Sequence, residues 1–111
     1  MPIDFQMLKL PFAKTKGNDL GNTQVLTFVW PTTVLTRPRP PVAMISSFDL
    51  EFGSEERHFH QMRVNLVVRE PTGQAGNRVD VEVNILLRDF TGHTDDFYQG
   101  EVWVTMFVER Q

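Results

Sequence analysis

Hydrophobic and polar residues alternate along most of the chain. The clearest case is the segment VDVEVNILLR at 79–88. Alternation with a period of two is typical of a β-strand that packs one face on a core and leaves the other in water. The apolar row expected to face inward is Val79, Val81, Val83, Ile85 and Leu87.

The segment QMRVNLVVRE at 61–70 shows the same alternation. Met62, Val64, Leu66 and Val68 are expected inside, and Arg63, Asn65 and Arg69 outside. Between the two segments lies PTGQAGN at 71–77, which is rich in the residues that form turns. The sequence therefore predicts an antiparallel strand pair joined by a turn.

Further strands are predicted at 3–10, at 23–30 and at 44–52. The second of these would place Leu26, Phe28 and Trp30 on one face. Loops are predicted over 11–22 and 30–41, where glycines and prolines gather.

The stretch RPRPPVAMISSFDLEF at 37–52 allows three interpretations: a linker, a proline-rich docking peptide or the entry to a buried strand. Neither flank is large enough to fold alone, which argues against a linker. The docking peptide competes, but the prolines run directly into apolar residues. The favoured interpretation is a strand that brings Met44, Phe48 and Leu50 into the core.

The last apolar run, EVWVTMFVE at 101–109, is hydrophobic on both faces. One row holds Val102, Val104, Met106 and Val108, and the other holds Trp103 and Phe107. This pattern predicts either a central strand buried on both sides or a strand that meets another subunit. Trp103 and Phe107 are the candidate oligomer interface.

Together these segments predict an all-β protein with about six strands and no substantial helix. An antiparallel β-sandwich is expected, with a small barrel as the alternative. At 111 residues the chain is expected to form one domain over 1–111, in which 1–22 supply an N-terminal strand or arm and a loop.

Composition excludes several classes of function. There is no cysteine, which rules out disulfides, thiolate catalysis and cysteine zinc sites. The net charge of −3 argues against nucleic acid as a partner. No apolar run is long enough for membrane insertion, and the N-terminus lacks the pattern of a signal peptide. A soluble protein is expected, either cytoplasmic or exported by a non-classical route.

His58 and His60 would lie on one face of a strand, where two imidazoles and a carboxylate could hold zinc. No third ligand is close in sequence, so solvated histidines are favoured and no metal or cofactor is expected. The loop DFTGHTDDFY at 89–98 offers His93, Asp95 and Tyr98, but an ordinary hairpin turn is the favoured explanation of its composition. No catalytic motif is present, and an enzyme is not expected.

Arg63 should project from the polar face of its strand. It would either pair with Asp80 or Glu82 across the sheet, or offer a rigid fork of donors to a hydroxylated or anionic ligand.

The order of four segments resembles the H-type lectin domain found in snail agglutinin and the C-terminal part of discoidins. The resemblance covers roughly residues 23–109. Its segments are LTFVW, RPRPPVAMISSFDLE, QMRVNL and TGHTDDFYQGEVWVTMFVE. The chain departs from the family pattern at Gly92, where tryptophan is usual, and Trp103 is one position out of phase.

The resemblance implies a sugar site formed by Arg63, His93 and Tyr98, with Asp95 as a further candidate. It also implies a homo-oligomer, either a trimer or a hexamer of two trimers. The leading functional hypothesis is a non-catalytic carbohydrate-binding module that gains avidity from several weak sites. The alternative is a structural or assembly protein, such as a virion, tail or secretion component, that does not bind sugar.

Overall fold

The structure of the chain is a computed structural model that describes residues 3–16, 21–52, 59–89 and 97–111. Only the backbone is described at 13–15, 51–52, 59–61, 88–89 and 97. The described residues form seven β-strands and no helix. They are β1 (Ile3–Lys16), β2 (Asn22–Val29), β3 (Val34–Leu35), β4 (Val42–Phe52), β5 (Phe59–Val68), β6 (Arg78–Asp89) and β7 (Phe97–Arg110).

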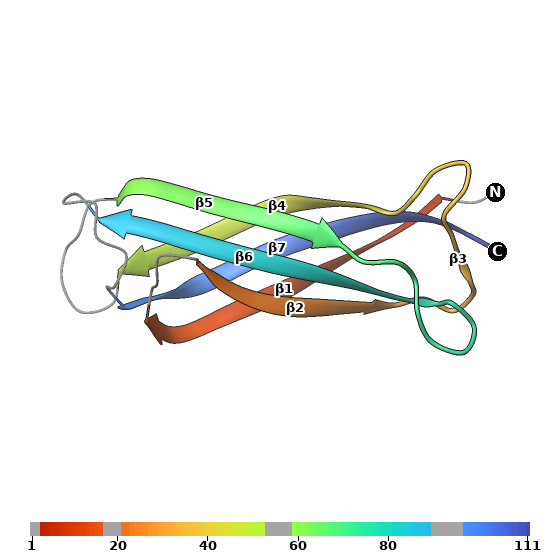
Figure 1. The fold of residues 1–111 in the computed structure, drawn as a ribbon, viewed down its shortest axis with the longest axis horizontal. Helices are drawn as coiled ribbons and strands as arrows, with labels where there is room; N and C mark the ends of the chain where they lie inside the picture. The colour runs from red at the N-terminus through yellow and green to blue at the C-terminus, as the bar shows by residue number, and fades with distance from the viewer. Residues whose placement is uncertain (1–2, 17–20, 53–58, 90–96) are drawn as a thin grey trace.

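Two antiparallel sheets pack face to face in an elongated sandwich, as Figure 1 shows. Sheet A places β7 in the centre, with β1 along one edge and with β4 and the short β3 along the other. Sheet B has the order β2-β6-β5. The all-β sandwich predicted from the alternating pattern is therefore confirmed, with β3 as an additional short strand.

The strongest alternating segments form the core as predicted. All five inward residues of β6 are at most 3% exposed. Leu26, Phe28 and Trp30 from β2 and its end are also buried, and the inward row of β5 packs against the same cluster. The inner row of β7 completes the core with Val102, Val104, Met106 and Val108.

The N-terminal segment belongs to the sheet more fully than the sequence predicts. β1 pairs with β7 from Ile3 to Lys16, so the loop predicted from residue 11 is wrong for residues 11–16. Pro11 is tolerated because β1 is an edge strand, where a missing N–H costs no ladder hydrogen bond. Phe12 follows it into the core at 2% exposure.

A β-bulge in β4 corrects the prediction for the proline-led strand. Ile45 pairs with Val104 and Ser47 with Trp103, which leaves Ser46 as the extra residue. Its hydroxyl donates to the Trp103 carbonyl at 3.1 Å. The bulge shifts the alternation by one position, so Ala43 and Ile45 pack on the core before it and Leu50 after it.

Two of the three predicted core residues of this strand are wrong, for two different reasons. Met44 lies opposite Thr105, on the outer face of the sheet, and is 49% exposed. Phe48 lies opposite the inward-facing Val102 but is also 49% exposed, because β4 is an edge strand. Leu50 is buried as predicted.

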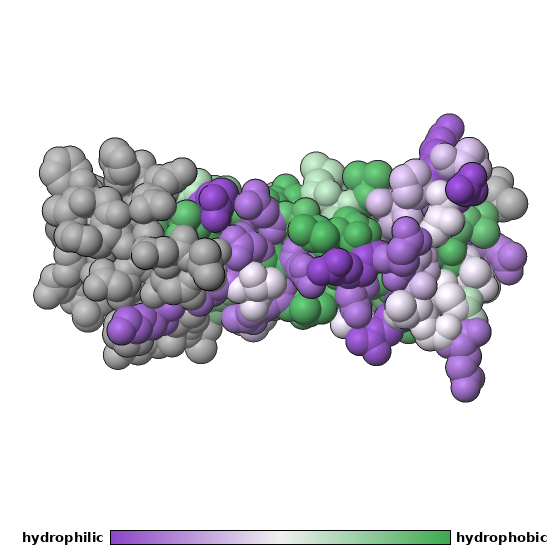
Figure 2. All heavy atoms as spheres, viewed as in Figure 1, coloured by the Kyte–Doolittle hydropathy of each residue, from purple (hydrophilic) through white to green (hydrophobic). Residues whose placement is uncertain are grey.

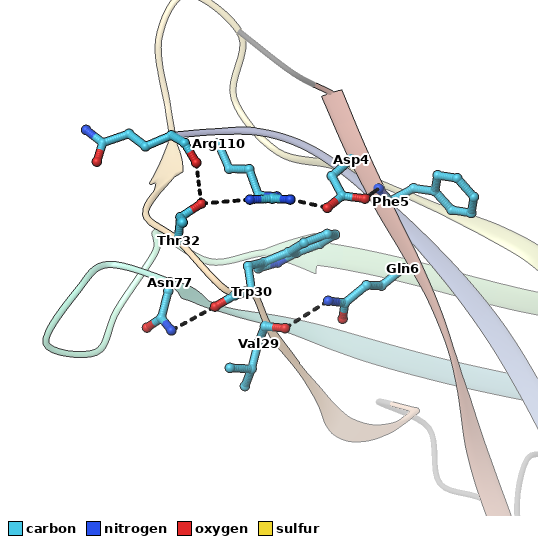
Figure 3. A network of polar contacts seen from close by, with 9 residues as sticks. Asp4, Phe5, Gln6, Val29, Trp30, Thr32, Asn77 and Arg110 are labelled. Carbon is cyan, nitrogen blue, oxygen red and sulfur yellow. Dashed lines mark hydrogen bonds and ion pairs between the residues drawn. The ribbon is translucent and has the colours of Figure 1, made fainter.

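A polar network fastens the end of the sandwich where both chain termini lie (Figures 1 and 3). Arg110 donates to Asp4 at 2.8 Å and to the Thr32 hydroxyl at 3.0 Å. Hydrogen bonds from Arg110 and from the Phe5 N–H hold the pKa of Asp4 below its ordinary value. The Gln6 amide donates to the Val29 carbonyl at 2.8 Å and so joins the two sheets.

Candidate functional site

Arg63, the predicted sugar-binding arginine, is exposed on the outer face of sheet B. In the register of β5 and β6 it lies opposite Leu86. The two carboxylates considered as its partners bind other arginines. Asp80 pairs with Arg78 at 3.2 Å, and Glu82 pairs with Arg69 at 2.6 Å. Arg63 is therefore directed to the outside of the sandwich, as the strand pattern predicts.

Tyr98 takes a different position from the one that sugar stacking requires. It lies in β7 of sheet A, is 1% exposed, and packs against Phe12 with 6.2 Å between ring centroids. Its hydroxyl accepts a hydrogen bond of 2.7 Å from the Asn22 amide. Burial raises the pKa of this phenol, and the Asn22 hydrogen bond opposes the shift.

The structure does not bring Arg63 and Tyr98 together within one chain, because they belong to opposite sheets and Tyr98 faces the core. His93 and Asp95 lie outside the described residues. The predicted four-residue sugar site is thus represented here by Arg63 alone.

The histidine pair gives no metal site in the described part of the chain. His58 lies outside the described residues, and only the backbone of His60 is described, at the start of β5. Among the residues whose side chains are described, no three His, Asp or Glu side chains gather as metal ligands would.

Around Arg63, the outer face of sheet B carries polar side chains together with three exposed valines, Val25, Val29 and Val67. Thr23, Asn84 and Asn65 align in one row across its three strands, and the Asn84 amide donates to the Thr23 hydroxyl at 2.9 Å. Figure 2, in the orientation of Figure 1, shows polar side chains interspersed with apolar ones. We call this surface, which includes Arg63 and Asn65, the polar face.

A groove of about 320 Å³ runs beside the far end of β5. Its walls come from the segment before β4 and the residues after β5: Thr36, Arg37, Pro40, Pro41, Val68, Arg69, Glu70 and Pro71. Arg69 forms an ion pair with Glu82. The other charged residues that line the groove are Arg37 and Glu70. Opposite charges of equal number select no ligand class by themselves.

The outer face of sheet A is apolar, in contrast to the polar face. Six large hydrophobic side chains on this surface are between 39% and 63% exposed. We call this surface the apolar face; its members are Ile3, Phe5 and Met7 of β1, Val42 and Met44 of β4, and Phe107 of β7, with the partly buried Trp103 beside them.

Strand register brings the members of the apolar face together. Phe5 and Val42 both pair with Phe107, from opposite sides of β7, and Met7 and Met44 both pair with Thr105. The rings of Phe5 and Phe107 are 6.0 Å apart between centroids. Figure 3 shows the Phe5 ring directed away from the Asp4–Arg110 network. The apolar face is therefore continuous across three strands.

Charged residues border the apolar face at both ends. At one end Lys9 lies 3.6 Å from Glu101 and 5.9 Å from the centroid of the Trp103 ring, and the indole N–H donates to Glu101. At the other end Arg39 lies 3.7 Å from Glu109, next to an apolar hollow of about 100 Å³.

The predicted interface residues Trp103 and Phe107 both belong to this face. Sequence reasoning missed its contributions from β1 and β4. The signal was the second apolar row of the N-terminal segment, Ile3, Phe5 and Met7, which alternates with Asp4 and Gln6.

No protein-family model, no curated protein and no solved structure matches this chain. Among the described residues, none forms a helix that could cross a membrane. The two outer faces of the sandwich are therefore the surfaces that bear on function.

Proposed function

We propose that this protein is a non-catalytic assembly protein, a β-sandwich that acts by binding through the apolar face of sheet A. The observation that carries the proposal is the set of six large apolar side chains, 39–63% exposed, in adjacent rows of one sheet. At about 150–200 Å² for a free side chain of this size, they expose on the order of 500 Å² of apolar surface. Apolar patches of several hundred Å² commonly mark interaction sites.

The contrast between the two outer faces supports this choice. A solvated sheet usually places polar residues outward. Sheet B follows this rule at Thr23, Asn84 and Asn65, although the smaller Val25, Val29 and Val67 are also exposed on it. Sheet A breaks the rule on the strand row Phe5–Phe107–Val42, where polar residues would cost the fold nothing. A partner that removes this row from water accounts for the difference.

The test compares apparent mass in an extract of cells that make the protein. The wild-type chain should run in a complex larger than one chain, and the double variant Phe5→Asp, Phe107→Asp should run as a single chain. The matched control is Val25→Asp, Val29→Asp, which changes two residues of similar exposure on sheet B and should leave the complex intact. A wild-type chain that runs alone in extract would contradict the proposal.

A second candidate function is carbohydrate binding at the polar face, as the resemblance to H-type lectins implies. The specific observation in its favour is that Arg63 and Asn65 are exposed two positions apart on one rigid strand. A guanidinium and an amide are groups suited to sugar hydroxyls, and the Thr23 hydroxyl lies in the same row as Asn65, two strands away. Tyr98 is not among the proposed contacts, because its ring is buried.

A glycan array tests this candidate with the wild type, Arg63→Ala and the control Arg78→Ala, an arginine at the far end of the same sheet. Sugar binding that Arg63→Ala abolishes and Arg78→Ala preserves would support it. A wild type that binds no glycan would reject carbohydrate binding and leave the assembly proposal unaffected.

A further inference from the structure

The partner that covers the apolar face can be specified further. We infer that it is a second copy of this chain, packed with its own apolar face against the first. This inference rests on the proposed function, since it names the partner of the same surface. Area, shape and charge each support a copy of the chain over other partners.

The area is what a homodimer needs. A standard interface buries about 800 Å² on each partner, and homodimer interfaces are about 65% apolar. About 500 Å² of apolar surface per chain is therefore required, which equals the order of magnitude that the apolar face exposes. The polar remainder is available at its border, from Lys9, Glu101 and Arg39.

The apolar face has the shape of the outer surface of a β-sheet that no other element covers in the described part of the chain. The face consists of strands β1, β7 and β4 side by side, with side chains that stand out from the sheet. Two such faces can pack about 10 Å apart with interdigitating side chains, as the inner faces of a sandwich do. A two-fold arrangement would place the same residues, including Phe5 and Phe107, on both sides of the contact.

The charges favour a copy of this chain over an anionic surface. The net charge of the chain is −3, and both ends of the apolar face carry acidic groups. A nucleic acid or an anionic membrane would bring further negative charge next to Asp49 and next to the Lys9–Glu101 pair. A copy of the chain offers both signs.

The charges also fix the orientation. The Arg39 side chain is 71% exposed at one end of the face. Asp49, which lies opposite Glu101 in the register of β4 and β7, is exposed at the other end. A two-fold axis in the interface, perpendicular to the strands, exchanges these ends. Arg39 of each copy then approaches Asp49 of the other, and the strands of the two copies run in opposite directions.

Sedimentation equilibrium of the purified chain tests the inference over a range of concentrations. The wild type should show a mass of two chains or more. Phe5→Asp should raise the dissociation constant by at least about tenfold, because a charge would be buried at the centre of the contact. Val25→Asp, which changes a residue of similar exposure on sheet B, should not change it. Circular dichroism confirms that each variant is folded.

Charge reversal tests the orientation. Arg39→Glu and Asp49→Arg should each weaken association, and the double variant should restore it. Failure of the double variant to restore association would overturn the exchanged-end arrangement.

Three outcomes overturn self-association. One is a wild type that stays monomeric at every concentration, and a second is equal weakening by Phe5→Asp and Val25→Asp. The third is a monomer that binds vesicles of anionic phospholipid through the apolar face. If the purified chain is monomeric but the face variants still lose the complex in extract, self-association fails and the proposed function stands. If no complex forms in either setting, both fail.

Discussion

Phe5 and Phe107 lie on neighbouring strands of sheet A with their ring centroids 6.0 Å apart, and both rings face outward. One belongs to the first strand of the chain and the other to the last. Phe5 is 63% exposed and Phe107 is 39% exposed. Two neighbouring aromatic rings on an outer face, tilted by 38° to each other, mark the surface through which we propose the protein acts.

Fluorescence should report the covering of this face. The chain has two tryptophans, of which Trp30 is buried in the core and Trp103 lies on the apolar face. In the variant Trp30→Phe, Trp103 is the sole indole, and its emission should shift to the blue as protein concentration rises. Adding Phe5→Asp to this variant should abolish the shift, and an emission maximum independent of concentration would count against association.

Gly100 is expected to be among the positions least tolerant of substitution. It has φ of +144°, and a Cβ at this position would collide with the Asp49 carbonyl oxygen on β4. Gly100→Ala should therefore lower the free energy of unfolding by about 3 kcal/mol, because backbone would have to move.

The control for this prediction is Gly76→Ala. Gly76 has φ of +60°, but a Cβ there would meet only the Thr33 methyl group at 3.5 Å. The cost should be limited to about 1 kcal/mol for the left-handed conformation. Chemical denaturation measures both variants, and equal losses would show that strands β4 and β7 do not approach as described.

The single tyrosine of the chain makes its burial measurable. Burial raises the pKa of Tyr98 above the ordinary value of 10.0, so the folded state favours the neutral phenol. The stability that this contributes is complete below pH 10 and is lost as pH rises through the folded pKa. Absorbance titration should show phenolate only above the ordinary range, until alkaline unfolding releases the ring.

Tyr98→Phe provides the comparison. The difference in stability between the wild type and this variant should shrink above pH 10, and at neutral pH it should be about 1 kcal/mol for the hydrogen bond with Asn22. A phenol that titrates at its ordinary value in the folded chain would mean that Tyr98 is accessible, and it would return this residue to the candidate sugar site.

The sequence was sufficient to predict the fold because the inward row of β5 and of β6, at every second residue, is apolar over most of its length. In β6 every second residue is apolar, and the core row follows directly. In β4 the simple alternation is interrupted at a single residue, Ser46. The sequence does not indicate which of the two serines, Ser46 or Ser47, is the unpaired residue of the bulge. The bulge exchanges the inward and outward positions of the β4 residues that precede it. Met44 was misplaced for that reason.

The apolar face was predictable only in part. Trp103 and Phe107 were identified because they form a second hydrophobic row in one strand. The rest of the face depends on which strands flank β7, and a single sequence does not encode that in any local pattern. Tyr98 was predicted as a ligand contact from the lectin resemblance. Its actual partners, Phe12 and Asn22, are distant in sequence, so no local pattern predicts that the ring is buried.

Methionine oxidation tests with native residues whether the purified chain covers its own apolar face. Met7 and Met44 are 53% and 49% exposed on the apolar face, and Met106 is fully buried in the core as an internal reference. The purified protein is prepared at a low and at a high protein concentration and is treated with peroxide. Oxidation at each methionine is followed by mass spectrometry. We expect Met7 and Met44 to oxidise rapidly when the protein is dilute and slowly when it is concentrated, while Met106 stays slow throughout. Rapid oxidation of Met7 and Met44 at both protein concentrations would contradict self-association, because the apolar face of the purified chain would then remain open to solvent.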